Sequence, residues 1–176
     1  LQSLRERLTY GKTMIQGSID ISSLKNWFLD LDYEIPLNPS RGFDLVDIND
    51  SYRYSSITAH LSKGTLHESF FKQKFTQLEN CLFAVSKMPP GSILPYHIDK
   101  YAYFKKKFKI TQEKIERVIV FLEDWKPGHI SEIDGTPITN WKKGDWIMWA
   151  GKTPHMAANL GHKDRYTLQI TSFQRD

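Results

Sequence analysis

The 176-residue sequence contains a single cysteine, Cys81, and this scarcity excludes two kinds of protein. One thiol cannot build an internal disulfide framework, and it cannot supply the cysteine ligands of a structural zinc site. So little cysteine is typical of the reducing cytoplasm. The first residues also show no charged segment followed by an apolar run, as a secretory leader would have, so we expect a cytoplasmic protein.

Long apolar runs and a strong charge of one sign are also missing. No stretch approaches the roughly 20 consecutive apolar residues of a membrane-spanning helix, so we expect no membrane contact. The net charge of +4 is compatible with an anionic substrate but gives no indication of nucleic-acid binding. Hydrophobic residues make up 40% of the chain and aromatic residues 13%, which predicts one globular domain over residues 1–176.

Residues 1–80 are predicted to be a largely helical support region. Apolar residues spaced by three and four indicate one amphipathic helix, which Ser22 or Ser23 would cap. Its apolar residues are Leu24, Trp27, Phe28 and Leu31. Thr65 and Glu68 have the spacing of a capping box and predict the start of a second helix. The apolar stripe of that helix consists of Leu66, Phe70, Phe71, Phe75 and Leu78.

Residues 81–173 consist of short apolar runs separated by turn residues, and we expect them to form strands. The expected strands are Leu82–Met88, Ile93–Asp99, Arg117–Leu122, Ile130–Ile133, Pro137–Trp141, Asp145–Trp149, His155–Asn159 and Arg165–Phe173. Many short strands with turns between them predict a sandwich or a barrel. Because helices precede strands, we expect an α+β fold that is mainly β, with the N-terminal helices packed on one sheet.

Two histidines and one aspartate form a candidate metal site. His97 and Asp99 are alternate residues of an expected strand, so their side chains project to the same face. His155 follows Pro154, which restricts the backbone just before it. Two histidines and a carboxylate form the facial triad of non-haem iron(II) oxygenases, which leaves adjacent metal positions open. The alternatives are two solvated groups on a strand edge and a hydrogen-bonded core histidine.

Arg165 lies ten residues after His155, at the start of the last expected strand. Its guanidinium group can bind a carboxylate through two hydrogen bonds. Thr167 lies on the same strand face and adds a hydroxyl donor. Leu168 and Ile170 occupy the opposite face, where they can pack on the helices. The alternative is a surface arginine in an edge strand.

The sequence resembles the iron(II)- and 2-oxoglutarate-dependent oxygenases in three motifs and in their order along the chain. These are His97-Ile98-Asp99, His155 and Arg165-Tyr166-Thr167. The resemblance covers residues 81–173 and implies a catalytic core with the double-stranded β-helix, a cupin-like jelly roll. It implies that His97, Asp99 and His155 are catalytic and bind Fe²⁺, and that Arg165 and Thr167 bind the C5 carboxylate of 2-oxoglutarate. It further implies O2-dependent hydroxylation of a C–H bond in a small molecule or a peptide side chain, with release of succinate and CO2.

Two branches of this superfamily are closest in pattern. The first is the aspartyl/asparaginyl β-hydroxylase-like branch, whose motifs are similar to Pro90-Gly91-Ser92, Trp141-Lys142-Lys143-Gly144-Asp145 and Arg117. That branch often has glycine where this chain has Asp99. The other is the prolyl-hydroxylase-like branch, whose collagen-type members have lysine at the position of Arg165.

Two other functions remain as alternatives. The first is a cupin-like metal-binding protein without oxygenase activity, but a simple cupin has no use for the pair Arg165 and Thr167. The second is a nucleic-acid-modifying oxygenase. The demethylase branch carries a second arginine six residues after the first, where this chain has Thr171, and this difference counts against nucleic acid as a partner.

Four further residues are candidates for the site. Arg117 can reach the co-substrate or a substrate carboxylate, or it can pair with an acidic residue. Trp149 is a candidate wall of the co-substrate site, with core packing as the alternative. Tyr101 and Tyr103 begin an aromatic and lysine-rich segment, 101–108, and are candidates for substrate binding as part of a lid. The alternative for this segment is a short amphipathic element with solvated lysines and docked rings.

Overall fold

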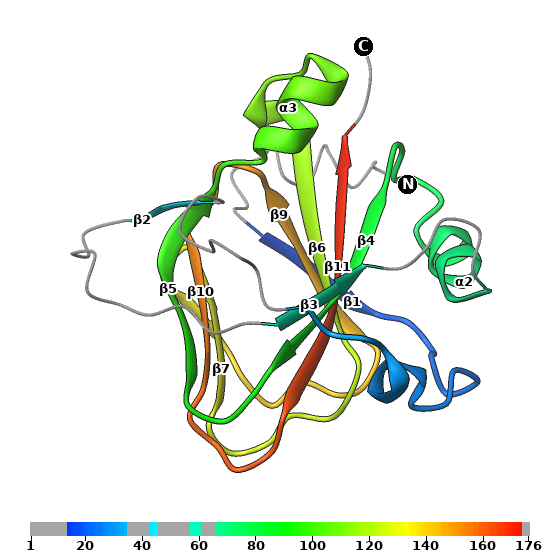
Figure 1. Cartoon of the computed structure of the whole chain (residues 1–176), viewed down its shortest axis with the longest axis vertical. Helices are drawn as coiled ribbons and strands as arrows, with labels where there is room; N and C mark the ends of the chain where they lie inside the picture. Colours follow the sequence, from blue (N-terminus) through cyan, green and yellow to red (C-terminus); the bar gives the residue numbers. More distant parts are fainter. Residues whose placement is uncertain (1–13, 35–42, 46–56, 61–65, 174–176) are drawn as a thin grey trace.

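Two antiparallel sheets face each other in the computed structural model, which describes residues 14–34, 43–45, 57–60 and 66–173 (Figure 1). The first sheet has the spatial order β1 (Met14–Ser18), β9 (Asp145–Ala150), β6 (Ile115–Phe121), β11 (Arg165–Phe173), β4 (Leu82–Met88) and β3 (Ile57–His60). The second has the order β2 (Phe43–Leu45), β5 (Ser92–Asp99), β10 (His155–Asn159), β7 (His129–Ile133) and β8 (Thr136–Ile138). This arrangement is the predicted jelly roll, a mainly β fold.

The N-terminal region is less helical than predicted. The helix expected around Leu24 is wrong in type, because the structure has a single 3-10 turn, η1 (Trp27–Asp30), which follows Asn26 and lacks a side-chain cap. Leu24 is buried from a separate turn, in which its N–H donates to the Ile21 carbonyl at 3.1 Å, and Phe28 is buried from η1, so their spacing did not require a longer helix. The second helix is confirmed as α2 (Leu66–Lys74), while Thr65 of the expected capping box lies outside the described residues. The strands β1, β2 and β3 also come from residues 1–80.

The central strands of the first sheet are packed on both faces, and β11 shows this most clearly. Tyr166, Leu168 and Ile170 point outward into a core that includes Phe71 of α2 and Phe28 of η1. Figure 1 shows these helices on the side of the first sheet that faces away from β5, β10 and β7. The prediction that Leu168 and Ile170 pack on the N-terminal helices is therefore confirmed. The alternate residues of β11 point into the space between the two sheets.

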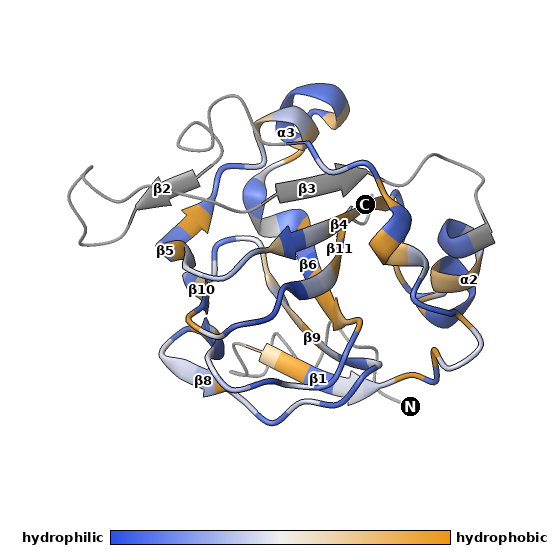
Figure 2. Cartoon of the chain, turned by 60° about the horizontal axis from the view of Figure 1, so that its bottom comes forward, coloured by the Kyte–Doolittle hydropathy of each residue, from blue (hydrophilic) through white to orange (hydrophobic). Residues whose placement is uncertain are grey.

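The segment 101–114 forms α3 (Ala102–Phe108) and the 3-10 turn η3 (Gln112–Lys114) above one end of the sandwich (Figure 2). Phe104 is buried against Ile115 and Phe173, and the ring of Phe108 lies 4.6 Å from that of Phe173. This is the amphipathic element with docked rings that the sequence offered as an alternative to a lid. Among the described residues, no helix has the length and apolar composition needed to cross a membrane.

Two glycines in turns have left-handed backbone for different reasons. Gly135 (φ 75°) follows Asp134 (φ 50°) in the two-residue hairpin between β7 and β8, and no atom lies within 4 Å of the position that a Cβ would take. Gly144 (φ 91°) precedes β9, and a Cβ there would lie 2.1 Å from the carbonyl oxygen of Ile19. Its own carbonyl also accepts a hydrogen bond of 2.9 Å from the Ile19 N–H.

Replacing these glycines with alanine separates backbone strain from a steric clash. Gly135→Ala is expected to lower the free energy of unfolding by about 1 kcal/mol, because only the left-handed φ opposes it. Gly144→Ala is expected to cost about 3 kcal/mol or more, because a backbone atom must also move. Urea unfolding of both variants measures the difference, and equal losses would contradict a clash at Gly144.

Candidate functional site

The structure brings His97, Asp99 and His155 together between the two sheets. His97 and His155 are partners in the β5–β10 pairing, and their ring centroids lie 4.3 Å apart. Asp99 lies at the end of β5, with Oδ1 3.5 Å from Nε2 of His97 and Oδ2 3.8 Å from Nε2 of His155. One ligand atom from each of the three residues lies within 4.8 Å of the other two. The triad predicted from sequence is thus assembled in space.

Local backbone geometry orients both imidazole rings. Between the pairs His97–His155 and Leu94–Ala157, β5 has one more residue than β10, which makes a β-bulge. The bulge contains Pro95, and a proline is tolerated there because a bulge does not need its N–H for the ladder. His97 donates its Nδ1–H to the Pro95 carbonyl at 2.6 Å, and His155 donates to the Thr153 carbonyl at 3.0 Å. In the neutral rings each Nε2 therefore carries a lone pair on the side of Asp99, the arrangement of metal-binding histidines.

Charges around the triad keep the ligands in the states that a metal requires. Burial opposes ionisation of Asp99, but the guanidinium of Arg117 holds the Asp99 pKa well below its usual range. Arg117 donates from Nη2 to Asp99 Oδ2 at 2.6 Å. Burial lowers the pKa of His155 to about 4, so this imidazole is neutral at pH 7 and can donate its lone pair.

Arg165 is buried between the sheets, with 4% of its surface exposed. It donates from Nη2 to Ser131 Oγ and from Nη1 to the sulfur of Met88, while its Nε has no hydrogen-bond partner. Its guanidinium carbon lies 5.4 Å from the ring centroid of Trp141. Burial lowers the pKa of Arg165 to about 10, which leaves it a cation at pH 7.

Within the described part of the chain, no carboxylate forms an ion pair with Arg165. A buried cation without an anion is costly. Arg165 therefore has the properties of a residue that receives an anionic ligand.

The distance between Arg165 and the triad follows from strand register. Ile133 pairs with His155 across β7 and β10, and Ser131, the partner of Arg165, lies two residues from Ile133 on the same face. Two residues of a strand span about 7 Å. Arg165 thus contacts β7 two residues from the position that pairs with His155.

Trp149 lies beside the triad, next to His155. It is buried in a cluster with Phe121, Ile133, Trp141 and Ile147, and its ring centroid is 5.0 Å from that of His155. Its indole Nε1 has no hydrogen-bond partner. Core packing, the alternative offered by the sequence, is thus correct. The unpartnered donor also makes Trp149 suitable for contact with a bound ligand.

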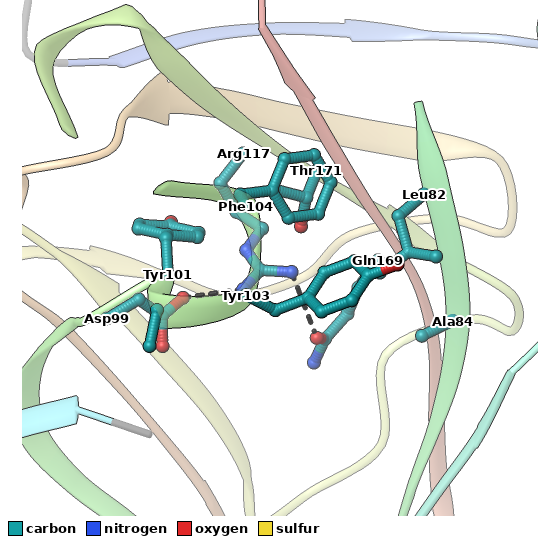
Figure 3. Close-up of a pocket in the computed structure, with 10 residues that line it drawn as sticks. Leu82, Ala84, Asp99, Tyr101, Tyr103, Phe104, Arg117, Gln169 and Thr171 are labelled. Carbon is teal, nitrogen blue, oxygen red and sulfur yellow. Dashed lines mark hydrogen bonds and ion pairs between the residues drawn. The ribbon is translucent and has the colours of Figure 1, made fainter. Parts of the chain in front are cut away.

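A cavity of about 660 Å³ opens beside Asp99 (Figure 3). Its lining includes Tyr101 and Tyr103, the two residues for which substrate contact is a prediction. Arg117 lies in its wall and also donates to Oε1 of Gln169 at 3.3 Å. Arg117 thus has the acidic partner that the sequence allowed, and this partner is Asp99.

Sequence reasoning missed the residues that complete the site on β11 and β7. Gln169 and Thr171 line the cavity, and Ser131 binds Arg165. Gln169 and Thr171 continue the alternation of Arg165 and Thr167 along β11, and this period of two is a signal that the sequence contained. Thr167 is buried on the inward face, beside Ser86 of β4. Ser131 had no comparable signal, because its role depends on contact between the two sheets.

Comparisons with known proteins agree with the fold. The chain matches no protein-family model and no curated protein sequence. It is similar in structure to a prolyl-4-hydroxylase from Pseudomonas putida, with a TM-score of 0.63, 13% identity and 95% of each chain covered. It is also similar to the viral collagen prolyl hydroxylase of Paramecium bursaria Chlorella virus-1, solved as a 2OG complex, with a TM-score of 0.59, 11% identity, and 93% of this chain and 98% of that one covered. At these identities the likeness concerns the fold alone.

Proposed function

We propose that the protein is an Fe²⁺- and 2-oxoglutarate-dependent dioxygenase that hydroxylates a C–H bond of a small molecule or a peptide side chain. The observation that carries this proposal is Arg165, a buried cation that forms no ion pair among the described residues and lies between the same two sheets as the triad. A metal site alone needs no such residue, whereas a dicarboxylate bound to the metal does. The viral hydroxylase with the same fold was solved with 2OG, which supports this choice of co-substrate.

The residues present fit both groups. Two Nε2 lone pairs and one carboxylate are the donor set of a facial iron site, and both histidines are oriented by backbone carbonyls. The unpartnered donors Arg165 Nε and Trp149 Nε1 suit a ligand rich in acceptor oxygens. The strand distance of about 7 Å between Ser131 and Ile133 matches a five-carbon dicarboxylate that reaches from the metal to Arg165.

Each part of the chain then has a definite task. His97, Asp99 and His155 hold the metal, and Arg117 keeps the Asp99 carboxylate oriented. Arg165 anchors the distal carboxylate, while the cluster around Trp141 and Phe121 keeps water away from it. When bound, iron and 2-oxoglutarate supply the chemistry that activates O2 for C–H hydroxylation, with succinate and CO2 as co-products. The cavity beside Asp99 is where the substrate would lie.

Anaerobic visible absorption tests the proposal. Purified metal-free protein is titrated with Fe²⁺ and then with 2-oxoglutarate, and a weak charge-transfer band is expected only when both are present. Succinate itself serves as the matched control, because it carries both carboxylates but lacks the keto group. If iron binds but no band appears, the result contradicts the oxygenase proposal and favours a cupin-like metal-binding protein. Failure to bind iron would contradict both.

A further inference from the structure

The cavity beside Asp99 has an unusual balance of apolar surface and charge. Among the described residues that line it, Arg117 is the one basic residue and Asp99 the one acidic residue. The rest of the lining consists of Leu82, Ala84, Tyr101, Ala102, Tyr103, Phe104, Gln169 and Thr171. Figure 3 shows Asp99 and Tyr101 on one side of the cavity, with Leu82 and Ala84 across from them and Arg117 between. A few polar groups within mostly apolar walls are typical of a small-molecule site.

Arg117 is held firmly in this position. Its Nη2 donates to Asp99 at 2.6 Å and its Nη1 donates to Gln169 at 3.3 Å. The guanidinium carbon also lies 5.2 Å from the centroid of the Tyr101 ring. These contacts fix the plane of the guanidinium group at the wall of the cavity, where a bound molecule can reach it. Only one of them, the contact with Asp99, neutralises its charge.

When Asp99 serves as a metal ligand, which rests on the proposed function, its one negative charge is shared between Arg117 and the ion. The ion brings two positive charges and Arg117 a third, while Asp99 provides one negative charge and both histidines bind as neutral rings. Of the two carboxylates of 2-oxoglutarate, one pairs with Arg165 and the other adds a single negative charge at the metal. Among the groups of the described residues, one positive charge then remains beside the cavity, and a buried excess charge favours an anion.

We propose that the substrate is a small molecule with an apolar body and one carboxylate, and that this carboxylate binds to Arg117. A volume of about 660 Å³ is in the range of small-molecule sites rather than of surfaces that receive folded partners. α3 supports this size, because Phe104 and Phe108 dock it on Phe173 and so fix the rim of the cavity. Gln169 and Thr171 provide neutral hydrogen-bonding groups for the rest of the molecule.

The test compares phenylacetate with phenylacetamide, which match in shape and differ in charge. Both are titrated by calorimetry into the full chain loaded with Co²⁺ and saturated with 2-oxoglutarate, conditions that avoid turnover. Phenylacetate is expected to bind at least tenfold more tightly than the amide. Arg117→Gln is expected to abolish this preference, while Arg117→Lys, which keeps the charge, retains most of it. Lys106→Gln, which removes one exposed positive charge of α3 outside the cavity lining, is the matched control and is expected to retain the preference fully.

The outcomes separate this inference from the proposed function. If the wild-type protein fails to bind Co²⁺, the proposed function and this inference both fail. If Co²⁺ binds but the wild-type protein does not prefer phenylacetate over phenylacetamide, this inference alone is wrong. The same holds if Arg117→Gln keeps the preference. If 2-oxoglutarate displaces phenylacetate, the anion at Arg117 belongs to the co-substrate, and the inferred substrate carboxylate is likewise wrong. Circular dichroism of each variant confirms that the fold is intact.

Discussion

Arg165→Met is expected to weaken 2-oxoglutarate binding to the metal-loaded protein by roughly 100-fold, or about 3 kcal/mol. The physical reason is the loss of a buried guanidinium that would pair with the distal carboxylate. Methionine fills similar space against Trp141 and Phe121 without a charge. Calorimetry under anaerobic conditions measures the dissociation constant. Arg165→Lys keeps the charge without the two-pronged geometry, so we expect an intermediate loss of about tenfold.

In the metal-free protein, the same substitution is expected to preserve or raise the free energy of unfolding. Arg165 has no ion pair in the described part of the chain, so its removal eliminates an uncompensated buried charge. The free energy of unfolding of Arg165→Met, measured with urea, should therefore equal or exceed that of the wild type. A variant that loses stability while retaining 2-oxoglutarate affinity would show that Arg165 is a structural residue.

His155→Ala is expected to weaken Fe²⁺ binding by more than about 100-fold, beyond the usual effect of losing a supporting hydrogen bond at a metal site. It removes one of three ligand groups, and the remaining pair, His97 and Asp99, comes from one strand. Anaerobic equilibrium dialysis gives the affinity, and the charge-transfer band should disappear with it.

His129→Ala is the matched control for loss of a buried imidazole. His129 is 1% exposed and its Nε2–H donates to the Lys163 carbonyl at 3.1 Å, but it lies outside the triad. This variant is expected to lose stability and to keep stoichiometric iron. Equal iron affinity in His155→Ala and the wild type would remove His155 from the ligand set.

Most of the sheet architecture was predictable because alternation and turn residues are local signals. The bounds of β4 and β11 agree with the predicted strands Leu82–Met88 and Arg165–Phe173. The convergence of His97 and Asp99 on one face follows from the period of a strand. The approach of His155 to this pair followed from resemblance, because no local pattern specifies that β10 pairs with β5.

The errors have equally physical causes. Eight residues around Leu24 show helical spacing, but this length does not distinguish a helix from two buried turns. The partner of Arg117 was missed because Asp99 lies 18 residues away and contacts it across the two sheets. Such contacts depend on how the sheets face each other, which strand patterns do not contain.

The two-sided packing of β11 has a consequence for how this protein can change over evolutionary time. Tyr166, Leu168 and Ile170 contribute to the core shared with α2, whereas Gln169 and Thr171, on the other face, contribute to the cavity. Substitutions at these two sets of positions are expected to affect different properties, because the first set supports the core and the second faces the cavity. Mutation at Gln169 and Thr171 can therefore change the shape of the cavity while the core against α2 stays intact, which makes this strand a starting point for directed evolution.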